Sequence, residues 1–134
     1  MRLISTALVV TMLAASTAGA SAQDASKGKS VFNQCMACHR LDVALVGPPL
    51  KGVVGRKAGS VAGYSYSSLM KTAGEAGLVW DQNNLVDYLK NPTEYLTAYV
   101  KSKGKTAEGS SKMTYMLANE NQRKNVVAYL AEQK

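Results

Sequence analysis

The sequence predicts an all-α fold of about four to five helices joined by long loops. Three observations support this class. Apolar residues recur at helical spacing in several separate segments, polar residues suited to N-caps precede those segments, and no alternating strand pattern lasts more than a few residues. The chain has 134 residues and no internal repeat, so we expect a single domain.

The first helix is expected to begin at Asp24, a good N-cap, and to run toward Cys38. One face of this segment carries residues spaced at i, i+3, i+4 and i+7, namely Gly28, Val31, Phe32 and Cys35. Residues 47–63 are rich in Gly and Pro, and they are expected to form a loop.

Two helices are expected in the middle of the chain. A short one is predicted near residues 67–72, and Asp81 is a suitable N-cap for the next. Leu85, Tyr88 and Leu89 form the apolar side of this second helix. Asn91-Pro92 should end it, because the residue before a proline disfavours the helical conformation.

Asn91 can in turn cap a further helix, with Pro92 at its first position and Glu94 at its third. Gly104 should end that helix, and residues 105–112 read as a polar loop. Its apolar stripe consists of Tyr95, Leu96, Tyr99 and Val100.

The last helix should begin at Asn119, where Gln122 is placed to complete a capping box. The residues that this helix should bury are Val126, Val127, Tyr129 and Leu130. A small domain with long loops and a thin core usually needs a crosslink, a metal or a cofactor for stability.

Residues 1–22 have the pattern of a cleaved secretory signal peptide, which leaves residues 23–134 as the mature domain. Arg2 supplies the positive start, residues 3–15 are mostly apolar, and Ala20-Ser21-Ala22 is a small-x-small cleavage site. The alternative is a membrane anchor, but the apolar run is shorter than the roughly 20 residues of a span, and Ser and Thr dilute it. We therefore expect an exported, soluble protein with no membrane span.

The expected mature chain is basic. The sequence has 16 Lys and Arg against nine Asp and Glu, and only Arg2 of these lies in residues 1–22, so fifteen basic residues against nine acidic ones give a charge of +6. Such a surplus favours an acidic partner, either a protein face, a membrane surface or a nucleic acid. Export and the absence of a basic-aromatic pattern argue against nucleic acid.

The most informative motif is Cys35-Met36-Ala37-Cys38-His39, since C-x-x-C-H is the attachment motif of haem c. Two thiols at this spacing can add to the two vinyl groups of the porphyrin, and the adjacent imidazole can then face the iron as proximal ligand. A structural zinc site needs four ligands, and a thioredoxin-like C-x-x-C needs a βαβ setting, which this sequence does not predict. A plain disulfide would leave His39 unexplained.

The sixth position of the iron needs a different residue type, because His39 is the only histidine. Methionine is the next candidate, and Met36 lies inside the attachment segment, too close to reach the far face of the haem. The methionines that remain in the mature chain are Met70, Met113 and Met116. A methionine on an apolar stripe is more often core filler, whereas Met113 follows a polar loop, where core packing is not the obvious role.

The order of these motifs over residues 23–134 resembles class I cytochromes c, most closely the bacterial cytochromes c2. The motifs that carry the resemblance are Gly28-x-x-x-Phe32, C-x-x-C-H, Gly47-Pro48, Gly52-Val53-Val54-Gly55-Arg56, Gly63-Tyr64-Ser65-Tyr66, Trp80, Tyr88 and Ser111-Lys112-Met113. The resemblance implies the class I cytochrome c fold, wrapped around one covalently bound haem.

The resemblance also implies roles for individual residues. The Pro48 carbonyl should accept a hydrogen bond from the proximal His39, and Met113 rather than Met116 should be the second axial ligand. Residues implied to surround the haem are Arg56, Tyr66 and Trp80 at the propionates and Tyr88 beside the axial methionine. The alternative for the aromatic residues is core packing, and for Arg56 a solvated surface charge.

The implied function is electron transfer, not catalysis. The iron of one haem c would cycle between Fe2+ and Fe3+ in a monomeric carrier located in the periplasm. Partners implied are redox complexes with acidic docking faces, namely a cytochrome bc1 complex as donor and a photosynthetic reaction centre or terminal oxidase as acceptor. Relative to mitochondrial cytochromes c, residues 97–110 are an insertion. The sequence does not place the lysines of this insertion relative to the docking face.

Two other classes remain alternatives. A haem enzyme or gas sensor needs an open iron position and a distal acid-base residue, usually a second histidine, which this sequence lacks. A structural module of a larger complex would use the haem only as a crosslink.

Overall fold

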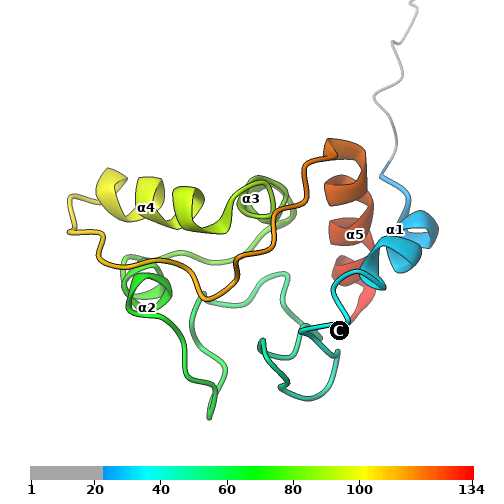
Figure 1. Cartoon of the computed structure of the whole chain (residues 1–134), viewed down its shortest axis with the longest axis horizontal. Helices are drawn as coiled ribbons and strands as arrows, with labels where there is room; N and C mark the ends of the chain where they lie inside the picture. Colours follow the sequence, from blue (N-terminus) through cyan, green and yellow to red (C-terminus); the bar gives the residue numbers. More distant parts are fainter. Residues whose placement is uncertain (1–22) are drawn as a thin grey trace, which may run out of the picture.

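Five helices and long connecting loops make up the computed structural model, which describes residues 23–134 (Figure 1). The helices are α1 (Ala25–Phe32), α2 (Ser68–Glu75), α3 (Gln82–Tyr88), α4 (Pro92–Ser102) and α5 (Glu120–Glu132). Within these residues no strand forms, and the β-type pairing is an isolated bridge between Lys57 and Val79. The predicted all-α class is therefore confirmed.

Residues 1–22, interpreted above as a signal peptide, lie outside the described residues. From residue 23 onward, none of the helices combines the length and the apolar character that a membrane crossing requires.

The helix starts agree with the predicted N-caps, because polar side chains satisfy the free backbone N–H groups of each first turn. Asp81 and Asn84 form a complete capping box at α3, with both hydrogen bonds at 2.8 Å. At α5 the Gln122 N–H donates to Asn119 Oδ1 at 3.0 Å, but among the described residues the reciprocal bond from the Asn119 N–H to the Gln122 side chain does not form. The prediction of a full capping box at α5 was therefore wrong.

The first helix is shorter than predicted. It ends at Phe32, and residues 33–38 continue as turns instead of extending the helix to Cys38. The N–H groups of Asn33, Gln34 and Cys35 each donate to a carbonyl three residues earlier, which tightens the chain. This turn carries the two cysteines, so the attachment segment has a local geometry of its own.

Two other helix ends can be compared with the prediction. The helix after Ser67 runs to Glu75, three residues beyond the predicted end at Thr72. The prediction that Gly104 ends the helix after Asn91 is confirmed. Gly104 has a φ of +69° just after α4 and closes that helix in the left-handed conformation.

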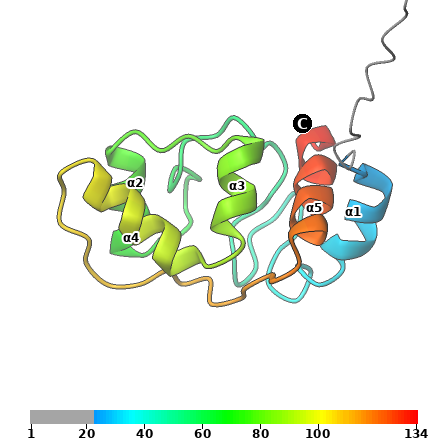
Figure 2. The ribbon, with the colours of Figure 1, turned by 90° about the horizontal axis from the view of Figure 1, so that it is seen from above.

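The two terminal helices α1 and α5 cross closely at one side of the molecule, seen from above in Figure 2. Gly28 lies at the crossing, where a Cβ atom would stand only 1.9 Å from the Asn125 carbonyl oxygen. Only glycine permits this approach of the two backbones. Next to the crossing, the Phe32 and Tyr129 rings pack with centroids 5.4 Å apart.

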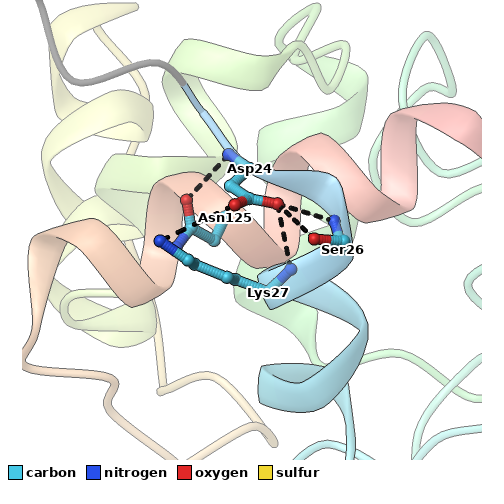
Figure 3. A network of polar contacts seen from close by, with 4 residues as sticks. All are labelled: Asp24, Ser26, Lys27 and Asn125. Carbon is cyan, nitrogen blue, oxygen red and sulfur yellow. Dashed lines mark hydrogen bonds and ion pairs between the residues drawn. The ribbon is translucent and has the colours of Figure 1, made fainter.

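The N-cap of α1 also connects the two helices (Figure 3). The Asp24 carboxylate accepts hydrogen bonds from the N–H groups of Ser26 and Lys27, at 3.0 and 3.1 Å. The Asp24 N–H donates to Asn125 Oδ1 on α5 at 2.9 Å. One residue thus begins α1 and fixes it to α5.

The other helices form the second side of the molecule, where α4 packs against α2 and α3 (Figure 1). The most deeply buried side chains there are Leu69, Leu78, Leu96 and Val100, each at most 2% exposed. The loop of residues 55–58 runs beside residues 78–80, through hydrogen bonds such as Trp80 N–H to Arg56 O at 2.9 Å. This pairing brings Arg56 next to Trp80, although the two residues are far apart in the sequence.

Gly28→Ala should lower the free energy of unfolding by about 2–3 kcal/mol, because the new methyl group collides with the backbone of α5. An exposed helical Gly→Ala change would instead stabilise the protein. Guanidinium denaturation of the haem-loaded protein measures the difference. Ser30→Ala, an exposed change on the same helix, serves as control and should stay within about 0.5 kcal/mol of wild type. A stable Gly28→Ala variant would show that the crossing tolerates a wider spacing.

Candidate functional site

The attachment segment follows α1 and presents the only histidine of the chain. His39 is buried, with 8% exposure, and its Nδ1–H donates to the Pro48 carbonyl at 2.8 Å. This bond places the proton on Nδ1 and leaves the Nε2 lone pair available to a metal. Burial lowers the pKa of the imidazole, the bond to Pro48 partly opposes that effect, and the nearby Arg56 charge lowers the pKa further. His39 is therefore a neutral, oriented imidazole.

Gly47 holds the other side of this ring. A Cβ at this position would lie 2.3 Å from His39 Cε1, so the backbone of residue 47 packs directly on the imidazole. The Gly47 N–H donates to the Cys38 carbonyl at 2.7 Å, which fastens the loop to the attachment segment. The Gly47-Pro48 pair thus fixes both the position and the tautomer of His39.

No disulfide joins Cys35 and Cys38. Burial raises the pKa of the Cys35 thiol to about 11, with a smaller contribution from Cys38. A redox-active C-x-x-C motif has a lowered thiol pKa, so this environment does not favour the thioredoxin-like alternative. Across residues 23–134, no three Cys, His, Asp or Glu side chains meet as a metal site, which also disfavours zinc.

Met113 lies in the long loop between α4 and α5, partly buried against the core. Its N–H donates to Ser111 Oγ at 3.1 Å, and the Ser111 N–H donates to Thr93 Oγ1 at 3.0 Å. Burial raises the pKa of Tyr88, the last residue of α3, to about 12. Through Ser111 and Thr93 the Met113 backbone is connected to α4.

The other two methionine candidates have different surroundings. Met116 is 57% exposed. Met70 belongs to α2 and packs against core residues, as a filler would. Of the three candidates, only Met113 combines partial burial with a loop position held by side-chain hydrogen bonds.

The residues expected to surround the haem are partly brought together. Trp80 and Tyr88 pack with ring centroids 4.8 Å apart, and Trp80 is 5% exposed. The Arg56 guanidinium donates to the Pro49 carbonyl at 2.9 Å, and the Tyr66 hydroxyl accepts from the Val61 N–H at 3.2 Å. Burial lowers the pKa of Arg56, and within residues 23–134 no carboxylate forms an ion pair with it. Arg56, Tyr66 and Trp80 carry N–H or O–H groups that can donate to an anion. Their roles at the haem propionates stay predictions.

The sequence analysis did not identify Arg123, which is 6% exposed. Its Nη1 donates to the carbonyls of Leu117 and Ala118 at 2.8 and 2.7 Å, which fixes the end of the loop that contains Met113. Its Nε is buried without a hydrogen-bond partner in the described part of the chain. The signal was present in the sequence, because Arg123 occupies the same apolar face of α5 as Val126, Val127 and Leu130, at i+3, i+4 and i+7.

The comparisons with known proteins agree with this geometry. The cytochrome c family model matches residues 25–134. Cytochrome c2 of Rhodopseudomonas palustris is 54% identical over 132 residues, which cover 92% of this chain and 95% of the relative.

Solved structures agree in fold as well as in sequence. Ferricytochrome c2 from Rhodopseudomonas palustris superposes with a TM-score of 0.82 at 57% identity, covering 83% of this chain and 99% of that one. Cytochrome c2 from Rhodospirillum centenum gives a TM-score of 0.81 at 44% identity, covering 83% and 98%.

A helical fold that presents C-x-x-C-H with a neutral, oriented imidazole defines a c-type cytochrome. The chain belongs to the cytochrome c family and, within it, to the class I cytochromes c2. It is an electron-transfer haemoprotein rather than an enzyme, and its cofactor is one covalently bound haem c. The predicted class, fold and cofactor are thereby confirmed.

Arg123→Ala should lower the free energy of unfolding by about 3 kcal/mol, because two carbonyls lose a charged donor and a buried cavity opens. Chemical denaturation of the haem-loaded protein measures this loss. The neighbouring change Lys124→Ala breaks only a surface ion pair with Glu120, so it should remain close to wild type. Equal losses for both variants would contradict a specific role for the buried guanidinium.

Proposed function

We propose that this chain is a soluble, periplasmic one-electron carrier. Thioether bonds to Cys35 and Cys38 would attach its haem c, and His39 and Met113 would be the axial ligands of the iron. The observation that carries the proposal is the Nδ1 bond of His39 to Pro48 at 2.8 Å, since it directs the free Nε2 toward a metal.

The bound haem supplies a one-electron couple between Fe2+ and Fe3+, and methionine ligation raises its potential. Neighbouring residues of the protein fix the positions of the two proposed axial ligands. Pro48 and Gly47 fix the imidazole, while Ser111 fixes the Met113 backbone. A carrier benefits from this rigidity, because both oxidation states keep the same ligands and little has to move.

The remaining haem contacts are part of the same proposal. Arg56, Tyr66 and Trp80 would donate hydrogen bonds to the haem propionates, and Tyr88 would support the segment of Met113. The closeness of Arg56 to Trp80 and the packing of the Tyr88 ring on Trp80, with centroids 4.8 Å apart, support these roles. A propionate near Arg56 would also compensate the unfavourable burial of its charge.

Export is proposed from the sequence pattern of residues 1–22, cleaved before Gln23. The mature carrier would be a monomer that receives electrons from a cytochrome bc1 complex. It would deliver them to a photosynthetic reaction centre or a terminal oxidase. The sequence resemblance and the match to cytochromes c2 support this class of partner.

Met113→Ala should abolish the weak far-red band that sulfur ligation gives to the oxidised protein, whereas Met116→Ala should keep it. Met116 is exposed and serves as the matched control. Optical spectra of the purified, haem-loaded variants measure the band, and the reduced Met113→Ala protein should also bind carbon monoxide. Loss of the band in the Met116 variant alone would reverse the ligand assignment, and ready binding of carbon monoxide by wild type would favour a sensor.

The rate of association with a purified cytochrome bc1 complex should fall steeply as salt rises. Attraction between the basic carrier and an acidic face is screened, since the screening length falls from about 10 Å at 0.1 M to about 3 Å at 1 M. Lys112→Gln should slow association more than Lys101→Gln, because Lys112 adjoins Met113 while Lys101 lies in the last turn of α4. Glutamine removes the charge of Lys112 and keeps an N–H donor on the side chain. Stopped-flow rates that do not depend on salt would contradict docking by a basic face.

A further inference from the structure

We infer that Tyr115 is a positioning residue for the axial methionine, through a hydrogen bond that joins the loop of Met113 to the haem attachment segment. The Tyr115 Oη–H donates to Gln34 Oε1 at 2.5 Å. Gln34 immediately precedes Cys35, and Tyr115 stands two residues after Met113. The inference rests on the proposed ligation by His39 and Met113.

The loop that contains Met113 has no helix of its own between α4 and α5, and it crosses from one side of the molecule to the other (Figures 1 and 2). Its position therefore depends on separate anchoring contacts. Ser111 is bonded to Thr93, the Lys112 ammonium to the Ser65 carbonyl, and the Leu117 N–H to the Leu89 carbonyl at 2.9 Å. Arg123 adds the bonds to the Leu117 and Ala118 carbonyls described above.

The bond from Tyr115 differs from these anchors in what it connects. The others attach the loop to α3, α4, α5 or the residues near Ser65. Among the hydrogen bonds of residues 23–134, only Tyr115–Gln34 joins residues 110–118 directly to residues 33–40. Those two segments carry the four residues proposed to hold the haem, so this bond acts on the separation between the two axial ligands.

The surroundings of the bond indicate a local role more than a stabilising one. Tyr115 is 44% exposed, and Gln34 is also exposed, so the hydroxyl adds little to the core. An exposed hydrogen bond contributes modestly to global stability. It can nevertheless bias a local equilibrium in which the loop moves and Met113 leaves the iron, because local opening costs much less free energy than unfolding.

Titration of the oxidised, haem-loaded protein with imidazole measures this equilibrium, since imidazole binds the iron only where Met113 has left it. Tyr115→Phe removes the hydroxyl alone and should tighten the apparent affinity for imidazole by about threefold to tenfold. Gln34→Ala should have a similar effect. In the double variant the two effects should not add, because both changes break the same bond.

Tyr99→Phe is the matched control. This change likewise removes one tyrosine hydroxyl. That hydroxyl donates to the Ala76 carbonyl at 3.5 Å and forms no hydrogen bond with residues 110–118 or 33–40 in the described part of the chain. Its imidazole affinity should stay within about twofold of wild type. Guanidinium denaturation of all variants separates a local change from a general loss of stability.

Wild-type affinity in Tyr115→Phe would overturn the inference, as would additive effects in the double variant. The proposed ligation has its own test in Met113→Ala. If that variant keeps the far-red band, the ligand assignment fails and the role of Tyr115 fails with it. If that variant loses the band while Tyr115→Phe behaves as wild type, only the positioning role fails.

Discussion

The close crossing of α1 and α5 at Gly28 determines the position of both ends of the site. α1 leads directly into the turn that carries Cys35 and Cys38, while α5 carries Arg123, which holds the end of the Met113 loop. The spacing of these two helices therefore sets the distance between segments that are far apart in sequence. A side chain at residue 28 would collide with the Asn125 carbonyl and move one segment relative to the other.

Around this crossing, the two proposed axial ligands are held in different ways. His39 is fixed at short range, since Pro48 and Gly47 follow within nine residues and act on the ring itself. Met113 depends on longer-range contacts, because its loop has no helix and its anchors come from several elements. Loss of single anchors should therefore affect the methionine side before the histidine side. In the proposed ligation methionine is also the weaker ligand, so a local change in the loop would open the iron without unfolding the protein.

Local signals predicted most of the helices and the cofactor. Caps such as Asp24, Asp81 and Asn91 lie where expected, because a capping side chain acts only on the next few residues. Some helix boundaries differ from the prediction. The first helix ends at Phe32 because the attachment segment turns tightly, and Gln122 does not complete a box. The C-x-x-C-H motif indicated the cofactor, since its chemistry is contained in five adjacent residues.

The sequence by itself determined the cofactor and the class and pointed to His39 as the proposed proximal ligand, because these depend on neighbouring residues whose spacing is fixed by the covalent chain. Only the tertiary structure decided what holds Met113, the proposed second ligand. The helical spacing places Arg123 on the buried face of α5, but the packing of α5 against the loop end decides which carbonyls it meets, and Tyr115 meets Gln34 across 81 positions of sequence. Such contacts arise from the packing of separate elements, and no local pattern encodes them.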